Sequence, residues 1–281
     1  MSDSRLTWEE AVDWLRQQPD KNELVYHCYY DDPVHEAAER FSQSEEWLAV
    51  VRLLKKYLPG KVLDLGAGRG ISSYAFAKSG CRVVALEPDS SDVVGAGAIQ
   101  ALIDVTNLPI EIVQEYGETL PFPENTFDVV YGRAVLHHAN DLQKLCKEAS
   151  RVLKPGGVFL ATREHVISKH DDLQKFLDAH ALHFLYGGEN AYLLDEYISA
   201  VSSSALELDK VFGPFDSVIN YSPMTQKQFM KRIASGLKRY LGQKIAFWIA
   251  QFRFIQHFYG HRFSSMSDVP GRHYTFLAYK A

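Results

Sequence analysis

Residues 62–70 read VLDLGAGRG, and this stretch decides the fold. Its first four residues are mostly apolar, as in a short buried strand. Glycines then follow at alternate positions, at Gly66, Gly68 and Gly70, and glycine reaches positive φ and lets a ligand approach the backbone. Residues 71–80 carry apolar side chains at helical spacing and end on a glycine, which favours a helix that stops there. A strand, a glycine turn and a helix N-terminus together predict a site for a polar or anionic ligand group.

The spacing of the glycines limits the classes of ligand that this site could bind. A dinucleotide fingerprint has the form G-x-G-x-x-G, but Ile71 stands where the third glycine would be. Asp64 lies two residues before the first glycine. A carboxylate there can accept hydrogen bonds from an ammonium group, directly or through water, whereas it would repel a pyrophosphate. The pattern therefore predicts a ligand with an amino acid at one end and a nucleoside at the other, and it disfavours an NAD-dependent oxidoreductase.

Four segments, in this order and spacing, resemble the class I S-adenosylmethionine-dependent methyltransferases, in the group with ubiquinone-type and other small-molecule methyltransferases. They are VLDLGAGRG (62–70), VVALEPD (83–89), LPFPENTFDVVYGRAVLHHAND (120–141) and EASRVLKPGGVFLATRE (148–164). The resemblance covers residues 45–165. It implies an α/β fold with a doubly wound, mostly parallel seven-stranded sheet, the Rossmann-like methyltransferase fold. It also implies S-adenosylmethionine as the cofactor and S-adenosylhomocysteine as its product.

The resemblance also assigns cofactor contacts. Glu87 ends the second strand, where its carboxylate would accept bonds from both ribose hydroxyls. Tyr116 stands at the usual acidic position for adenine, so Glu118 or Glu115 would replace it. The turn after the fourth strand would contact the methionine part, although Arg133 could instead pair with Asp64 or hold an anionic substrate. The predicted cofactor-binding residues are Asp64, Gly66, Ala67, Gly68, Gly70, Glu87, Pro88, Glu118, Gly132 and Arg133.

Three histidines are candidate general bases, since imidazole takes up a proton near neutral pH. His137 and His138 follow the fourth strand, where in many relatives this pair only packs and positions a helix. His165 closes the fifth strand. No His, Cys or acidic residues stand at metal-ligand spacing, so no metal site is predicted.

The predicted substrate contacts lie on either side of this core. Arg163 and Glu164 close the fifth strand, which could equally be a solvated strand end. Tyr29 and Tyr30 would belong to an N-terminal flap, where aromatic faces favour the sulfonium cation, or would simply pack between helix and sheet. Tyr186 opens a loop with two glycines that would allow a hinge motion over the substrate.

Periodicity divides the chain of 281 residues into three regions of one structural unit. Residues 1–58 are predicted to form an N-terminal helical cap, residues 59–165 the S-adenosylmethionine-binding core, and residues 166–281 the rest of the sheet. Helical inserts at 166–204 and 224–262 are expected to form a lid over the substrate. Within the first region, capping boxes are predicted at Thr7 with Glu10 and at Ser42 with Glu45. Strands are predicted near 61–65, 82–87, 110–114, 127–131, 157–163, 206–212 and 273–280.

Charge is distributed unevenly. The formal net charge is −5, but residues 217–267 contain eight Lys or Arg and no Asp or Glu, so this segment is +8 and the remainder −13. The basic insert is either a solvated face, a contact with an anionic membrane surface or lipid-linked substrate, or a site for phosphate-bearing ligands. No groove-reading motif supports nucleic acid.

Composition adds further expectations. The 46% of hydrophobic residues suffices for a large core. No apolar leader or transmembrane stretch appears, and the three cysteines have no metal spacing, so we expect a cytoplasmic protein with reduced thiols. The sequence does not fix the oligomeric state. It predicts methyl transfer from S-adenosylmethionine to an O, N or C atom of a small-molecule acceptor. The alternative is a catalytically inactive cofactor-binding partner or regulatory protein.

Overall fold

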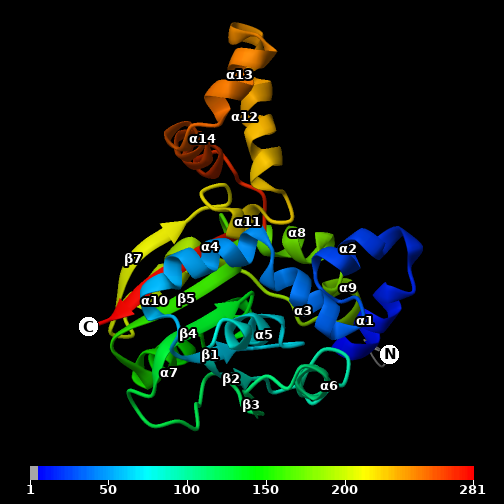
Figure 1. Cartoon of the computed structure of the whole chain (residues 1–281), viewed down its shortest axis with the longest axis vertical. Helices are drawn as coiled ribbons and strands as arrows, with labels where there is room; N and C mark the ends of the chain where they lie inside the picture. The colour runs from blue at the N-terminus through cyan, green and yellow to red at the C-terminus, as the bar shows by residue number, and fades with distance from the viewer. Residues whose placement is uncertain (1–5) are drawn as a thin grey trace.

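The computed structural model describes residues 6–281 and contains a mixed sheet whose strands follow the order β3-β2-β1-β4-β5-β8-β7. These are the seven strands that the sequence predicts, and a two-residue strand, β6, pairs beside β5 as an eighth. Figure 1 shows the sheet with helices packed around it. The bounds are β1 (Lys61–Leu65), β2 (Arg82–Leu86), β3 (Ile110–Val113), β4 (Phe127–Arg133), β5 (Leu153–Ile167), β6 (Tyr192–Leu193), β7 (Leu206–Phe212) and β8 (Arg272–Lys280).

Strands β1 to β5 run parallel, and β8 runs antiparallel between β5 and β7. The first strands are apolar on both faces because helices cover both. On one face, Val62 and Tyr131 pack against helices α3 (Val34–Ser42), α4 (Glu45–Leu54), α5 (Ile71–Lys78) and α6 (Ala96–Thr106). On the other, Leu63 and Phe159 pack against α7 (Leu142–Val152) and α10 (Leu194–Ser202). The strand order reverses next to β1, which leaves a crevice at the carboxyl ends of β1 and β4.

The N-terminal region is helical, as expected. Helix α1 (Trp8–Arg16) begins with the predicted capping box of Thr7 and Glu10, and α2 (Asn22–His27) follows. The second predicted box is wrong. Ser42 ends α3, and Ser44 caps α4 by accepting a hydrogen bond from the Trp47 N–H at 3.0 Å.

The two inserts differ in position. The first contains α8 (Asp172–Ala179), α9 (His183–Tyr186) and α10, and α8 and α9 lie close to the N-terminal helices in Figure 1. The second follows α11 (Val218–Tyr221) and consists of α12 (Gln226–Leu241), α13 (Gln243–Ala250) and α14 (Arg253–Ser265). We call residues 226–265 the arm. Figure 1 shows the arm projecting away from the sheet.

The expected role of the second insert as a lid over the substrate stays a prediction. No residue of the arm lines the main cavity described below. The arm instead buries a small core of its own, built on Phe229, Ile233, Ala246 and Ala250. These helices thus bury part of their apolar surface against one another. Within residues 6–281, no helix has both the length and the apolar character needed to cross a membrane.

Candidate functional site

A cavity of about 1310 Å³ lies at the carboxyl ends of the central strands. It brings together most of the side chains that the sequence singled out. Those that line it are Asp64, Gly66, Ala67, Gly68, Glu87, Pro88, Glu118, Arg133, His137, His138, His165, Tyr29, Tyr30, Arg163 and Tyr186. Three predicted site residues, Gly70, Gly132 and Glu164, do not line it.

The glycine turn has the backbone that its sequence predicts. Gly66, Gly68 and Gly70 have φ values of 54°, 54° and 78°, a region that other residues rarely adopt. A Cβ built on Gly66 would lie 2.7 Å from Cγ2 of Val135, so the turn and the loop after β4 pack too closely for a side chain. Gly70 is the N-cap of α5. The turn thus leaves backbone groups open to the cavity.

Asp64 lies at the base of this end of the cavity, 1% exposed. Its Oδ2 accepts a hydrogen bond from the Ser73 hydroxyl of α5 at 2.6 Å. Burial raises the pKa of Asp64 from 3.8 to about 7, opposed by the Ser73 hydrogen bond and by Arg133 and reinforced by Glu87. A cation arriving beside this carboxylate would favour its ionised form.

Glu87 follows β2 directly and faces the same space. Its Oε2 accepts the Gly68 N–H at 2.7 Å, and its Oε1 accepts the Asp89 N–H at 3.0 Å. Burial raises the pKa of the carboxyl, and these two backbone donors oppose that shift. Each oxygen keeps a further lone pair for a ligand hydroxyl. Glu118, at the rim, accepts the Asn140 N–H at 2.8 Å and so also holds the turn before α7.

Arg133 does not pair with Asp64, which corrects one of the alternatives above. Its Nε donates to Glu46 Oε1 at 2.7 Å, and Arg163 Nη1 lies 3.7 Å from Glu46 Oε2. Arg163 also donates to the carbonyls of Ile219 and Ser222. Burial raises the pKa of Glu46, but the two guanidinium groups override this and hold it below its usual value. The Glu46 carboxylate of α4 thus connects Arg133, at the end of β4, with Arg163 of β5.

Tyr29 and Tyr30 reach the cavity from the segment after α2. Arg69, inside the glycine turn, holds this segment by donating to the Tyr29 carbonyl at 2.8 Å and the Asp31 carbonyl at 2.9 Å, and it pairs with Asp32. The N-terminal cap is therefore fastened to the turn itself. The sequence reasoning missed Arg69, because no local pattern distinguishes it from a surface arginine.

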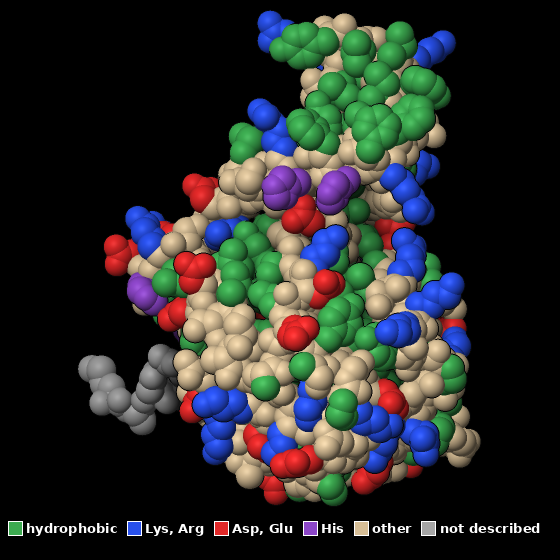
Figure 2. All heavy atoms as spheres, turned by 90° about the vertical axis from the view of Figure 1, so that its left-hand side faces the viewer, with side chains coloured by type: hydrophobic (Ala, Val, Ile, Leu, Met, Phe, Trp, Pro, Cys, Tyr) green, Lys and Arg blue, Asp and Glu red, His purple; other side chains and the backbone are tan. Residues whose placement is uncertain are grey.

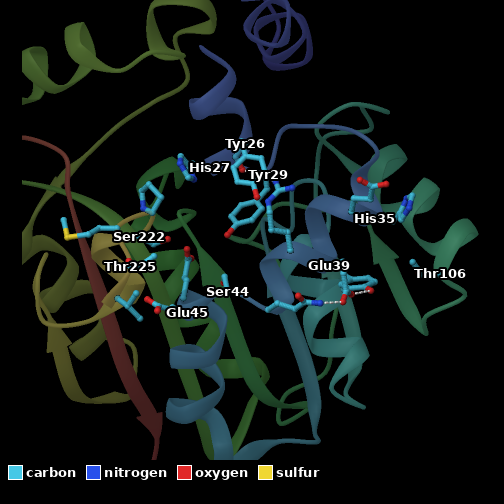
Figure 3. Close-up of a pocket in the computed structure, with 18 residues that line it drawn as sticks. Tyr26, His27, Tyr29, His35, Glu39, Ser44, Glu45, Thr106, Ser222 and Thr225 are labelled. Carbon is cyan, nitrogen blue, oxygen red and sulfur yellow. Dashed lines mark hydrogen bonds between the residues drawn. The ribbon is translucent and has the colours of Figure 1, made fainter. Parts of the chain in front are cut away.

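A second pocket, of about 680 Å³, opens on the outer side of Tyr29. Figure 3 shows Tyr29 and Tyr26 from the N-terminal segment facing this space, with Ser44 and Glu45 of the α4 start across from them. Tyr29, His27 and Ser222 line both pockets. The segment around Tyr29 is thus a thin wall between the main cavity and the outside.

The histidines lie at the other end of the main cavity. His137 belongs to a 3-10 turn (Leu136–His138) and is 1% exposed. His138 is the most open, with 41% of its side chain exposed and its Nδ1 3.1 Å from the Gly188 carbonyl. Burial lowers the pKa of His165 to about 3 and that of His137 well below its usual range. Both rings are therefore neutral at neutral pH. Their neighbours His180 and His273 also line the cavity.

Glu164 is not a substrate contact in this structure. It is 0% exposed and lies beneath the cavity, where it accepts the backbone N–H of Val135 at 3.1 Å and of His137 at 3.2 Å. Its Oε2 is also 2.8 Å from His137 Nδ1. The pairing of β5 with β8 is irregular between Ala161 and Glu164, where Arg163 has a φ of 59°, and the strand there presents Arg163 and His165 but not Glu164 to the cavity. Its role is to position the turn after β4.

Tyr186 and Glu189 close the cavity from the loop after α9. The Tyr186 hydroxyl donates to Glu189 Oε1 at 2.5 Å, and burial raises the pKa of that phenol, reinforced by the carboxylate. Burial also opposes ionisation of Glu189, but His180, His138 and His137 lower its pKa. Sequence reasoning missed Glu189, since nothing in the chain near it indicates which residues it meets.

The sheet order and the cavity at its carboxyl edge define a Rossmann-like domain, and comparison with known proteins shows which proteins it resembles. Residues 63–161 match the family model described as methyltransferase domain. Over 129 residues the chain is 36% identical to the ubiquinone/menaquinone biosynthesis C-methyltransferase UbiE of Cronobacter sakazakii, covering 44% of this chain and 50% of that protein. Residues 63–161 are therefore similar to methyltransferase domains, and the relative matched by the chain is a methyltransferase.

Solved structures extend the likeness of the fold. A sarcosine dimethylglycine methyltransferase homologue from Galdieria sulphuraria aligns with a TM-score of 0.56 at 21% identity, covering 93% of this chain and 97% of that one. A geranyl diphosphate methyltransferase in complex with SAM aligns with a TM-score of 0.57 at 16% identity, covering 92% and 95%. In sequence, the chain spans about half the length of the curated relatives it matches.

Proposed function

We propose that this protein transfers a methyl group from S-adenosylmethionine to an O, N or C atom of a small-molecule acceptor. The observation that carries the proposal is the continuity of one cavity from the glycine turn to the histidines. At one end lie two buried carboxylates, Asp64 and Glu87, beside the glycine turn, which lines the same cavity. At the other end lie arginine, tyrosine and histidine side chains, which are left to contact the acceptor when the cofactor occupies the first end.

In this proposal the cofactor occupies the end at β1 and β2. Asp64 meets the ammonium group of the methionine part, directly or through water, and Glu87 accepts the ribose hydroxyls. Glu118 lies at the rim on the adenine side. Tyr29, with its ring in the wall, approaches the sulfonium, since aromatic faces attract cations. The domain boundaries proposed from the sequence assign this end to residues 59–165.

The acceptor occupies the opposite end. Its lone pair attacks the methyl carbon as the carbon–sulfur bond breaks, and the positive charge leaves sulfur. The protein's main task is to align acceptor, methyl and sulfur, and Tyr30, Arg163 and Tyr186 are placed to do so. Where the acceptor must lose a proton, His138 is the histidine with the freest access, and His137 and His165 shape the wall beside it.

Calorimetric titration tests the cofactor half first. S-adenosylmethionine and S-adenosylhomocysteine should bind saturably and NAD should not. Loss of a hydrogen bond to a charged group costs about 1.5–3 kcal/mol, so Asp64→Asn and Glu87→Gln should each weaken binding by about ten- to a hundredfold. Glu111→Gln, an exposed change on β3, is the matched control. Unchanged affinity in both site variants would refute the assigned site.

A panel of acceptors with labelled cofactor then tests catalysis. Methylated product from one or more acceptors supports the enzyme. Saturable cofactor binding with no product across hydroxyl, amine and carbon acceptors would favour the alternative of an inactive cofactor-binding partner.

A second proposal concerns the arm, which we propose docks on an anionic membrane surface. All eight basic residues of the 217–267 segment lie on or beside it without a single acidic neighbour in the segment. Figure 2 shows hydrophobic side chains gathered over the arm, at the top of the view, with Lys and Arg around them. Its exposed large apolar side chains are Tyr240, Leu241, Ile245, Trp248, Phe252, Phe254 and Phe258.

Basic residues around exposed aromatic rings suit the interface of an anionic bilayer. Co-sedimentation with vesicles of neutral lipid, and with vesicles that also contain anionic lipid, separates apolar attraction from electrostatic attraction. We expect co-sedimentation with the anionic vesicles only, weakened by salt, and lost in a Trp248→Ser, Phe254→Ser double variant. Equal binding to both vesicle types, or none, would refute the electrostatic docking. Val105→Ser, an exposed apolar change on α6, serves as the control.

A further inference from the structure

Two histidines and one carboxylate meet in one corner of the main cavity. His137 comes from the turn after β4, His165 from the end of β5, and Glu189 from the loop after α9. One donor atom from each can be chosen so that all three lie within 4.8 Å of one another. The three residues are far apart in the chain, which is why linear spacing predicted no metal site.

The other ring nitrogen of each histidine is already engaged. His137 Nδ1 lies 2.8 Å from Glu164 Oε2, and His165 Nδ1 lies 2.9 Å from the Gly271 carbonyl. A carbonyl only accepts, so the His165 proton sits on Nδ1 and the lone pair on Nε2. Within residues 6–281, neither Nε2 takes part in a hydrogen bond. Metal-binding histidines typically have this arrangement, with the second nitrogen held by a carboxylate or backbone carbonyl.

The carboxylate is fixed in the same way. Tyr186 donates to Glu189 Oε1, which leaves Oε2 at 3.7 Å from His137 Nε2. In a tetrahedral site with bonds of about 2.0–2.1 Å, neighbouring donor atoms lie about 3.3 Å apart. The pair is thus close to the required spacing, and side-chain rotations would bring His165 within range. His180 Nδ1, 3.8 Å from Glu189 Oε1, lies just outside this group.

We propose that His137, His165 and Glu189 bind a divalent transition-metal ion of the Zn²⁺ type in the acceptor half of the cavity. Two imidazoles with one carboxylate suit such ions, whereas Mg²⁺ and Ca²⁺ take oxygen ligands. Three protein ligands leave coordination positions open toward the cavity. Resting on the proposed function, this assigns the acceptor to the class of molecules that offer an oxygen or nitrogen lone pair to a metal ion beside the methylated atom.

Metal binding can be measured without cofactor or acceptor. The whole chain, stripped with a chelator and dialysed, is titrated with Zn²⁺ by calorimetry and with Co²⁺ by visible absorption. We expect one equivalent to bind and a Co²⁺ spectrum of low coordination number. Glu189→Gln and His165→Ala should each weaken Zn²⁺ binding by at least about a hundredfold, and Glu164→Gln, which acts on His137 from behind, by about 10- to 100-fold.

The control is His257→Ala, an exposed histidine on the arm, which should bind like the unaltered chain. Zn²⁺ should also raise the melting temperature of the unaltered chain and of His257→Ala but not of Glu189→Gln, since a ligand stabilises the state that binds it. Absence of stoichiometric binding, or equal affinity in the ligand variants, would overturn the metal site. Neither result would touch the S-adenosylmethionine titration, so the two proposals fail separately.

Discussion

Removal of the Glu46 carboxylate should destabilise the protein more than most single changes at the site. Glu46 is 1% exposed and is shared by Arg133, at 2.7 Å, and Arg163, at 3.7 Å. In Glu46→Ala both guanidinium groups stay buried without their counter-charge. Loss of one partner from a buried pair costs about 3–5 kcal/mol, and because one carboxylate serves two cations, we expect the upper part of that range.

The same free energy can be expressed as a melting temperature. Unfolding entropy is about 2.1 cal/mol/K per residue near 60 °C, so for this chain 1 kcal/mol corresponds to roughly 1.7 °C. Glu46→Ala should therefore melt about 7–9 °C lower, measured by scanning calorimetry or circular dichroism. Glu36→Gln, an exposed change on α3, should melt like the unaltered chain.

A double variant separates lost charge pairing from lost packing. In Glu46→Leu with Arg133→Leu, one buried cation disappears together with the carboxylate, and apolar groups fill the space. This double variant should melt higher than Glu46→Ala. An unchanged melting temperature in Glu46→Ala, or a double variant less stable than the single one, would refute the reasoning.

Three further predictions concern the cofactor end. Gly66→Ala forces a side chain into positive φ and into contact with the loop after β4, so cofactor affinity measured by calorimetry should fall at least about tenfold; Gly236→Ala, with open space around its Cβ, should not change it. Because the pKa of Asp64 is about 7 and the ionised form binds the ammonium, cofactor affinity should rise from about pH 5.5 to pH 7.5. In the free protein, the stability that protonated Asp64 contributes declines as the pH rises from 3.8 to about 7. An Asp64→Asn variant whose cofactor affinity keeps the same rise would contradict the assignment. Arg69→Ala removes the donors that hold residues 29–32, so hydrogen exchange there should accelerate while β1 stays protected; unchanged exchange would contradict the anchor.

The sequence predicted that the glycine turn, Asp64 and Glu87 lie together because the determinants of this arrangement are local. The glycine turn, the buried strand before it and the helix after it are adjacent in the chain. The alternate glycine positions alone indicate the positive φ that Gly66 adopts. Asp64 and Glu87 stand at strand ends, and parallel strands bring those ends to one edge of the sheet. Their convergence follows from the topology alone.

Several side chains of the acceptor end were predicted, but the partners that hold them could not be, because they meet only through long-range packing. Glu46 lies 87 residues from Arg133, and no local pattern marks it as the partner. Glu189 lies in the loop after α9 of the first insert, and its Oε2 lies 3.7 Å from His137 Nε2 after the β4 strand. Even the direction of Glu164 depends on which face of β5 is covered. The position of the arm could not be predicted for a similar reason, since an amphipathic pattern indicates that one face of a helix is buried but not which element buries it.

Local determinants at one end of the cavity and long-range contacts at the other suggest how each end responds to substitutions. In the proposed function, the backbone of the glycine turn and two carboxylates would bind the cofactor, so few substitutions should preserve that binding. At the acceptor end, the wall consists of side chains held by one another: Glu164 holds His137, Tyr186 holds Glu189, and Glu46 holds Arg163. A change in one member reshapes the pocket without disturbing the glycine turn. Acceptor choice should therefore be alterable by substitutions that leave S-adenosylmethionine affinity intact, and such variants are the means to separate the two halves of the site experimentally.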